Sequence, residues 1–189
     1  MVSQTLPYKE TSEQAHEGII INKLSKFSIF VKNIYIRTFT SWLNFAKMLI
    51  DTYMIKVETD KAPKAIGPYS QAVRVGGFLY ISGQIAINPA TGKLIKEGTK
   101  GQTVQVIKNI EAILSTQNIG TKGHNKKFAD LSNVVKTEIF LQNINDFKDL
   151  NEAYASKFIQ EPLPARQVIE VSELPLNAKV EISCIAYLG

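Results

Sequence analysis

Two unlike charges stand on stretches of sequence that otherwise have the composition of buried strands. Arg166 lies at the start of ARQVIEV, and Glu181 lies near the start of KVEISCIAYL. A guanidinium binds a carboxylate through two parallel hydrogen bonds, and a carboxylate can orient a water molecule and accept its proton. The spacing of the pair by itself favours a salt bridge at the edge of a sheet, and a role in a functional site is the alternative.

The spacing of Arg166 and Glu181 favours proximity if the two closing strands form a hairpin. Fourteen residues, 167–180, separate them, and the segment SELPLNA in the middle has the composition of a turn. In an antiparallel hairpin around that turn, both charges would lie near the same end, within one or two rungs of each other. We therefore predict that β-pairing brings the arginine and the glutamate together.

Few other side chains could do chemistry. Cys184 is the only cysteine and lies within the apolar run VEISCIAYL, so we predict a packed, unreactive thiol. His16 and His124 are the only histidines, and their separation does not favour a zinc site. We expect no metal.

The last strand has two apolar rows, because successive side chains of a strand point to opposite faces. One row is suited to packing beneath helices. The other begins with the carboxylate of Glu181 and becomes apolar toward its end. We therefore predict that a second copy of the chain covers that face. The rows are Val180, Ile182, Cys184, Ala186 and Leu188, against Glu181, Ser183, Ile185 and Tyr187.

The preceding segments alternate between strand and helix patterns and give the order β-β-α-β-α-β-β, an α+β domain with two helices. In chain order, composition and periodicity predict a hairpin turning at Gly76-Gly77, a turn at 88–92, a helix over 102–117, a surface loop over 120–130, a strand over 134–141, a helix over 146–158 and the two closing strands.

Residues 1–53 differ from residues 54–189 in the distribution of charge. The whole chain has 189 residues and a net charge of +5. Within the first segment, no acidic residue stands between Glu17 and Asp51. Lys32, Arg37 and Lys47 interrupt the apolar run, which excludes a membrane span. A basic, hydroxyl-bearing, amphipathic stretch resembles a mitochondrial targeting segment. An unstructured or weakly helical appendage, or a functional start at Met54, are the alternatives. We expect a mitochondrial or cytoplasmic protein that is not secreted.

Several blocks in residues 54–189 occur in the order typical of one family. AIGPYSQAV (65–73), YISGQI (80–85), SNVVKTEIFL (132–141) and PAR followed by VEI resemble the reactive intermediate deaminase A family, also called YjgF-like. The resemblance implies a chorismate-mutase-like fold, a mixed sheet with two helices on one face, and a homotrimer with sites between subunits. It implies hydrolysis of 2-enamines and 2-imines, such as 2-aminoacrylate, to 2-keto acids and ammonia, without a cofactor or metal.

The resemblance also implies roles for single residues. Arg166 would bind the substrate carboxylate, and Glu181 would position the attacking water. Tyr69 would line the cleft, while the backbone at Ser82 and Gly83 would contact the substrate. Each of the last three has a simpler alternative: Tyr69 could be a half-buried aromatic in a turn, the Ser82 hydroxyl could bond only its own backbone, and Gly83 could mark a strand bulge.

Two features depart from the family pattern. Gln167 stands where a small or apolar residue is usual, and the loop over 119–130 is longer than usual.

Two functions other than imine hydrolysis stay open. They are a non-catalytic trimer that binds small ligands or chaperones proteins, and an RNA-binding translation inhibitor or ribonuclease. Residues 54–189 carry a net charge of only +3 and have no basic stripe interleaved with aromatics outside the 122–127 loop, so nucleic acid is not the expected partner.

Overall fold

A computed structural model describes residues 25, 28, 32, 36–43, 53–122 and 125–189, although the side chains of 121–126 are not described. The chain divides into two units, Met1–Ile50 and Asp51–Gly189. Among the described residues, no helix has both the length and the apolar character needed to cross a membrane.

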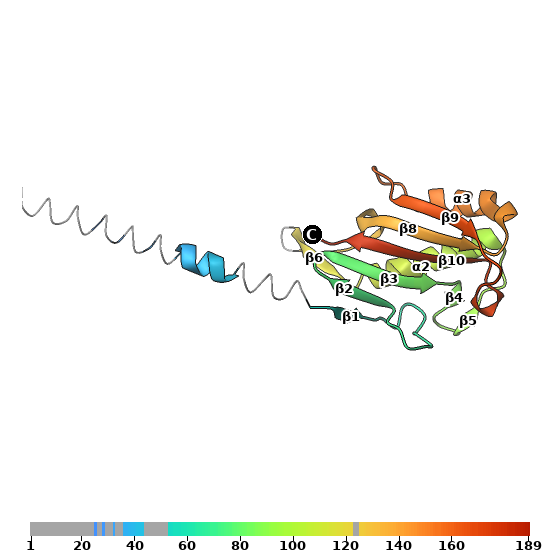
Figure 1. The fold of residues 1–189 in the computed structure, drawn as a ribbon, viewed down its shortest axis with the longest axis horizontal. Coiled ribbons are helices and arrows are strands. Elements are labelled where there is room, and N and C mark those ends of the chain that lie inside the picture. The colour runs from blue at the N-terminus through green and yellow to red at the C-terminus, as the bar shows by residue number, and fades with distance from the viewer. Residues whose placement is uncertain (1–24, 26–27, 29–31, 33–35, 44–52, 123–124) are drawn as a thin grey trace, which may run out of the picture. The chain divides into compact units, whose positions relative to one another are not determined.

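The second unit is built on a six-stranded mixed sheet (Figure 1). Its strand order is β1-β2-β3-β10-β8-β9, and every neighbouring pair is antiparallel except β8 and β9. The strands are β1 (Ile55–Val57), β2 (Ala72–Val75), β3 (Phe78–Gln84), β8 (Val134–Leu141), β9 (Ala165–Glu170) and β10 (Val180–Tyr187).

Local patterns correctly predicted two of these features. The strands β2 and β3 form a hairpin in which Val75 lies opposite Phe78. Gly76 in the turn has φ 56°, a left-handed conformation that glycine adopts without a steric penalty. The predicted strand over 134–141 has the bounds of β8.

The predicted hairpin between the two closing strands is wrong. Helix α3 (Phe147–Ala155) connects β8 to β9, and a connection through a helix allows β9 to run parallel to β8 at the sheet edge. The chain then crosses back, and β10 inserts between β3 and β8. The physical reason lies in burial, because β10 has a fully buried row and suits a central position, whereas β9 is largely exposed.

Two helices, α2 (Thr99–Leu114) and α3, cover one face of the sheet (Figure 1). Both were predicted, and α2 begins three residues earlier than expected. Gly98, the residue before α2, makes no side-chain capping bond, so the sequence carries no polar start signal there. The predicted inner row of β10 is buried beneath the helices, and Ile107, Ile110 and Leu150 pack in the same core.

The segment predicted as a loop over 120–130 is in large part a hairpin. Strands β6 (Asn118–Lys122) and β7 (Asn125–Phe128) pair antiparallel. A second small hairpin joins β4 (Ile87–Asn88) to β5 (Lys93–Leu94) around the predicted turn. Three short 3₁₀ turns complete the unit, at Leu131–Asn133, Ile144–Asp146 and Pro175–Asn177.

The sheet face opposite the helices carries exposed aromatic side chains. The rings of Phe78 and Tyr187 lie 5.2 Å apart, centroid to centroid, and Tyr80 lies 6.4 Å from Phe78. All three are exposed in the single chain. A cluster of exposed aromatics is a typical feature of surfaces that bind another protein.

Cys184 is buried in the inner row of β10, which confirms the predicted packed thiol. Burial disfavours the thiolate and raises the pKa of Cys184 to about 12. Since the thiolate is the nucleophilic form, Cys184 is unreactive near neutral pH.

Candidate functional site

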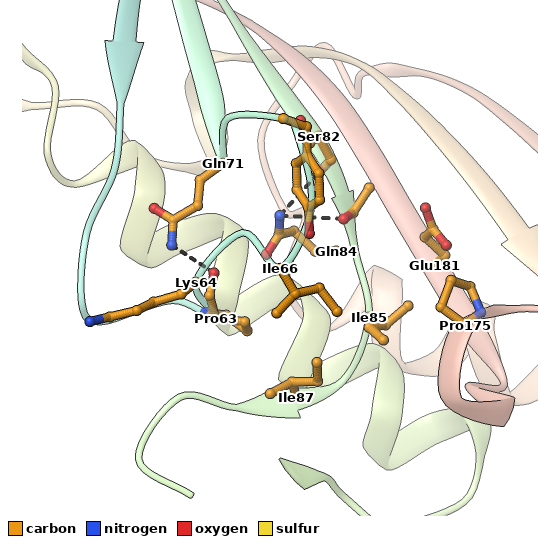
Figure 2. A pocket seen from close by; sticks show the side chains of 12 residues that line it. Pro63, Lys64, Ile66, Gln71, Ser82, Gln84, Ile85, Ile87, Pro175 and Glu181 are labelled. Atoms are coloured by element: carbon orange, nitrogen blue, oxygen red, sulfur yellow. Dashed lines mark hydrogen bonds between the residues drawn. The ribbon is translucent and has the colours of Figure 1, made fainter. Parts of the chain in front are cut away.

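A cavity of about 370 Å³ opens beside the end of β3 where Gly83 faces Glu181 on β10 (Figure 2). Its wall combines the loop before β2, the end of β3, the segment into β4 and the 3₁₀ turn before β10. The lining is mostly apolar, with one carboxylate. The lining residues are Pro63, Lys64, Ile66, Tyr69, Gln71, Ser82, Gly83, Gln84, Ile85, Ile87, Pro175 and Glu181.

Glu181 and Gly83 are in close contact. A Cβ atom added to Gly83 would overlap the Glu181 carboxylate, so the absence of a side chain at Gly83 makes room for the carboxyl group. Sequence alone offered a strand bulge as the simpler reason for this glycine. The β3–β10 ladder does shift register between Ile182 and Cys184, but the close approach of the carboxylate is the more direct reason.

The environment of Glu181 disfavours its charge. The side chain is partly buried, and this desolvation raises the pKa of the Glu181 carboxyl above its ordinary value. The neighbouring cavity surface from Ile85 and Pro175 is apolar (Figure 2). The ammonium of Lys64 points away from Glu181 in the same view, so it does not offset the desolvation. A carboxyl group in this state can exchange a proton closer to neutral pH than an exposed one.

Tyr69 and Ser82 also lie at this cavity. Tyr69 lines the cavity and is about half exposed. Its backbone amide donates to the carbonyl of Gly67 over 2.8 Å, which fixes the tight turn that holds the ring. The Ser82 hydroxyl donates to the Ser70 carbonyl at 2.7 Å, rather than to its own backbone, and Ser82 also lines the cavity.

Gln71 holds the cavity wall in place and was missed by sequence reasoning. It is 3% exposed, and its amide nitrogen donates to the carbonyls of Thr59, Ala62 and Pro63 at 3.0, 3.3 and 2.6 Å. Its amide oxygen accepts from the Thr59 backbone at 2.7 Å. These bonds anchor the loop that carries Pro63 and Ile66 to the cavity. The only available signal was a glutamine directly before an apolar strand.

We expect Gln71→Leu to destabilise the protein by roughly 2–4 kcal/mol, because buried backbone groups around residues 59–63 lose their partners. Urea unfolding should show this as a lower midpoint with an unchanged slope. Gln160→Leu is the matched control, since Gln160 makes one side-chain bond, 3.1 Å to the Leu131 carbonyl. Equal losses in the two variants would contradict the anchoring role of Gln71.

Arg166 lies at a second cavity, of about 530 Å³, between β9 and α3. Its Nη1 donates to Oδ1 of Asn151 over 2.9 Å. Its guanidinium carbon lies 4.8 Å from the centroid of the Tyr154 ring and 5.9 Å from that of Phe147. These contacts hold the guanidinium over an aromatic surface while it stays exposed.

Tyr154, which contacts the Arg166 guanidinium, is itself held in place by two contacts. Its hydroxyl lies 3.0 Å from that of Thr137 on β8, and its ring stacks on Phe158 at 4.2 Å. Burial raises the pKa of the Tyr154 hydroxyl, while Thr137 and Arg166 lower it by a smaller amount. Sequence analysis placed Tyr154 and Phe158 only within the predicted helix over 146–158 and did not identify them as neighbours of Arg166.

In one protomer, the side chains of Arg166 and Glu181 project from opposite faces of the sheet. Arg166 pairs with Thr137, which is fully buried under the helices, whereas Glu181 belongs to the outer row of β10. The two residues line separate cavities. The expectation that one hairpin places them side by side is therefore wrong for the single chain. Gln167 pairs with Glu138 and so points to the face opposite Arg166.

The described residues contain no group of three or more His, Cys, Asp or Glu side chains arranged to hold an ion. The donors that the cavities do present are a carboxylate, a guanidinium, hydroxyls and backbone groups. Such donors are suited to binding a small anionic molecule and moving its protons.

The fold is a small α+β domain with two cavities that hold the predicted site residues. Residues 59–188 match the family model described as Endoribonuclease L-PSP, and the chain belongs to this family. This confirms the resemblance identified from the sequence motifs.

Proteins similar to this chain carry deaminase names. Reactive Intermediate Deaminase A, chloroplastic, from Arabidopsis thaliana is 44% identical over 147 residues, covering 76% of this chain and 73% of that protein. A Mus musculus protein named 2-iminobutanoate/2-iminopropanoate deaminase is 42% identical over 133 residues, covering 70% and 90%. The crystal structure of RidA from the Antarctic bacterium Psychrobacter sp. PAMC 21119 matches with TM-score 0.61 and 41% identity, covering 70% and 98%. Deaminase activity is therefore present in the family.

We expect Gly83→Ala to displace the Glu181 carboxyl with little effect on folding. The atom nearest to the new methyl group is the end of the flexible Glu181 side chain, which can swing aside. If Glu181 assists hydrolysis of a 2-imino acid, kcat/KM for that substrate should fall roughly tenfold or more, because the carboxylate leaves its position. Gly98→Ala is the control, because nothing lies within 4 Å of a Cβ there. Unchanged kinetics in Gly83→Ala would show that this contact does not position the carboxylate.

Proposed function

We propose that the protein hydrolyses reactive 2-enamines and 2-imines, such as 2-aminoacrylate, to 2-keto acids and ammonia. The observation that carries this proposal is the Glu181 carboxyl, which lies against Gly83 in a mostly apolar cavity with its pKa raised by burial. The deaminase names of relatives with more than 40% identity give independent support.

In this mechanism the protonated imine, an iminium ion, reacts with one water molecule. The Glu181 carboxylate accepts a proton from water as the water oxygen bonds to the C=N carbon, and the C=N π electrons move to nitrogen, which becomes a neutral amino group. Glu181 then returns its proton to that nitrogen. The C–N bond breaks, ammonia leaves with the bonding electrons, and the hydroxyl proton passes to solvent water as the C=O bond forms. Acid–base assistance by one positioned group accelerates such steps by about 10²–10⁴-fold.

Arg166 would bind the substrate carboxylate, but it needs a second copy of the chain to do so. Arg166 and Glu181 point away from opposite sheet faces, so one protomer does not present both to a single molecule. The exposed aromatics of the outer face, Phe78, Tyr80 and Tyr187, favour its coverage by another copy. We infer a homotrimer in which Arg166 of one subunit shares a cavity with Glu181 of the next.

The proposal is tested with freshly generated 2-aminoacrylate. Purified protein should increase the rate of 2-keto acid and ammonium release above the spontaneous rate, in proportion to its concentration. Protein carrying both Arg166→Ala and Glu181→Gln is the control for adventitious acceleration. If the wild-type protein binds 2-keto acids but gives only the spontaneous rate, a non-catalytic binding role replaces the enzymatic one.

An RNA-directed function is the second candidate, because the family model has the name of an endoribonuclease. The net charge of +3 over residues 54–189 gives it little electrostatic support. It predicts RNA binding whose affinity falls steeply between low and moderate salt. Absence of binding at low salt would dismiss it.

We infer that residues 1–53 are a leader that directs the protein to mitochondria, because residues 18–50 have a basic composition. Mass spectrometry of the protein from its native cells tests this. An N-terminus near residue 54 would mean that the leader is removed or that synthesis starts at Met54. Detection of the intact residues 1–53 would mean that the leader is not removed.

A further inference from the structure

The N-terminal unit contains a helical stretch over residues 36–43 with one apolar side. Ile36, Phe39 and Leu43 are three and four residues apart, so they lie on one face of the helix, and Trp42 borders them. Their exposed fractions are 53%, 59%, 46% and 65% for Ile36, Phe39, Leu43 and Trp42. Four large apolar side chains are thus exposed within two turns of helix.

The other side of this helix is polar. Arg37 and Ser41 lie there and are exposed. The Thr40 hydroxyl donates to the carbonyls of Ile36 and Arg37 at 2.9 and 3.0 Å. Because its proton stays within the helix, Thr40 can lie at an apolar boundary at little cost in lost hydrogen bonds.

The charge around the helix has a single sign. Residues 18–50 contain five basic residues and no acidic residue, and Arg37 is exposed on the polar side of the helix. A short helix with aromatic residues on its apolar side and a basic residue on its polar side, within a segment of purely positive charge, is typical of segments that lie in the interface of an anionic bilayer. An acidic protein surface would complement the charge, but it would not require this many aromatic and aliphatic side chains.

We propose that this helix binds the surface of anionic phospholipid bilayers, with Phe39 and Trp42 entering the interface and Arg37 facing the headgroups. The helix lies on the bilayer rather than crossing it, since its apolar side is narrow and charges interrupt the run. This binding does not depend on the proposed deaminase activity.

Trp42 is the only tryptophan of the chain and serves as a built-in probe. Full-length protein is mixed with vesicles of phosphatidylcholine and phosphatidylglycerol at a ratio of about three to one, chosen to give a negative surface potential. Tryptophan emission should shift to shorter wavelength and become shielded from acrylamide, and the protein should sediment with the vesicles. Raising the salt concentration should weaken binding.

Matched variants separate the two faces of the helix. Phe39→Asn should weaken partitioning roughly tenfold or more, because a large apolar side chain is lost from the interface. Ser41→Asn places the same residue on the polar side and should change partitioning by less than about twofold. Arg37→Gln should weaken it by about fivefold.

Three outcomes would overturn the proposal. One is the absence of an emission shift or sedimentation with anionic vesicles. Another is equal, salt-insensitive binding to vesicles of phosphatidylcholine alone, which would remove the role of charge. The third is a Trp42 emission that is already short-wavelength and shielded without vesicles, which would mean that protein covers the apolar side.

Discussion

Replacing Arg166 with alanine should reduce kcat/KM for a 2-imino acid by about 10²–10³-fold, because the substrate carboxylate loses its charged partner. Most of the effect should be seen in KM if the guanidinium binds substrate and transition state equally. Arg166→Lys keeps the charge but not the planar fork, so we expect an intermediate loss of about tenfold. Steady-state kinetics with freshly generated imine measures both variants.

The shared site makes a stricter test possible. Arg166→Ala protein retains Glu181, and Glu181→Gln protein retains Arg166. If each site combines residues of two subunits, refolding an equal mixture of the two inactive variants should restore about a quarter of wild-type activity, the statistical share of intact sites. If the refolded mixture is as inactive as each variant by itself, the shared site is refuted. Loss of activity in the Arg166 variant does not test the shared site, because it is expected whether or not two subunits form the site.

Glu181→Gln should reduce kcat by about 10²–10⁴-fold, because the amide cannot accept the proton of the attacking water. For the wild type, kcat/KM should rise with pH as the Glu181 carboxyl, whose pKa is raised by burial, becomes ionised. The variant should lack this acidic limb. Glu111→Gln is the control, because Glu111 lies on α2 with its side chain partly exposed near Lys157.

The same group makes folding stability depend on pH. Since the pKa of Glu181 is higher in the folded than in the unfolded protein, the folded state binds more protons between the two values. Its contribution to stability is therefore complete below the unfolded pKa and is lost as pH rises through the folded pKa. Urea unfolding across that window should show a steeper loss for the wild type than for Glu181→Gln. If the unfolding free energy has the same pH dependence in both proteins, the Glu181 carboxyl is solvated in the folded state.

Near-neighbour patterns accounted for much of the architecture. Turn residues predicted the β2–β3 hairpin. Apolar residues repeating every two or every 3.6 positions predicted the buried row of β10 and both helices, and composition predicted the span of β8. The motifs around Tyr69, Ser82, Arg166 and Glu181 also identified the family. Three of these residues line one cavity, although Arg166 does not.

The side chains of each strand that share a face could be assigned from the amino acids alone, because that alternation is a property of a single strand. The face of the sheet that each row meets could not be assigned in this way, because it depends on the order and register of strands far apart in the chain. Only in the folded chain is it visible that β10 lies between β3 and β8, and that Arg166 rests on Tyr154 on the face opposite Glu181. The same holds for the role of Gln71 as an anchor of the cavity wall, since its partners converge only after the 59–63 loop folds back.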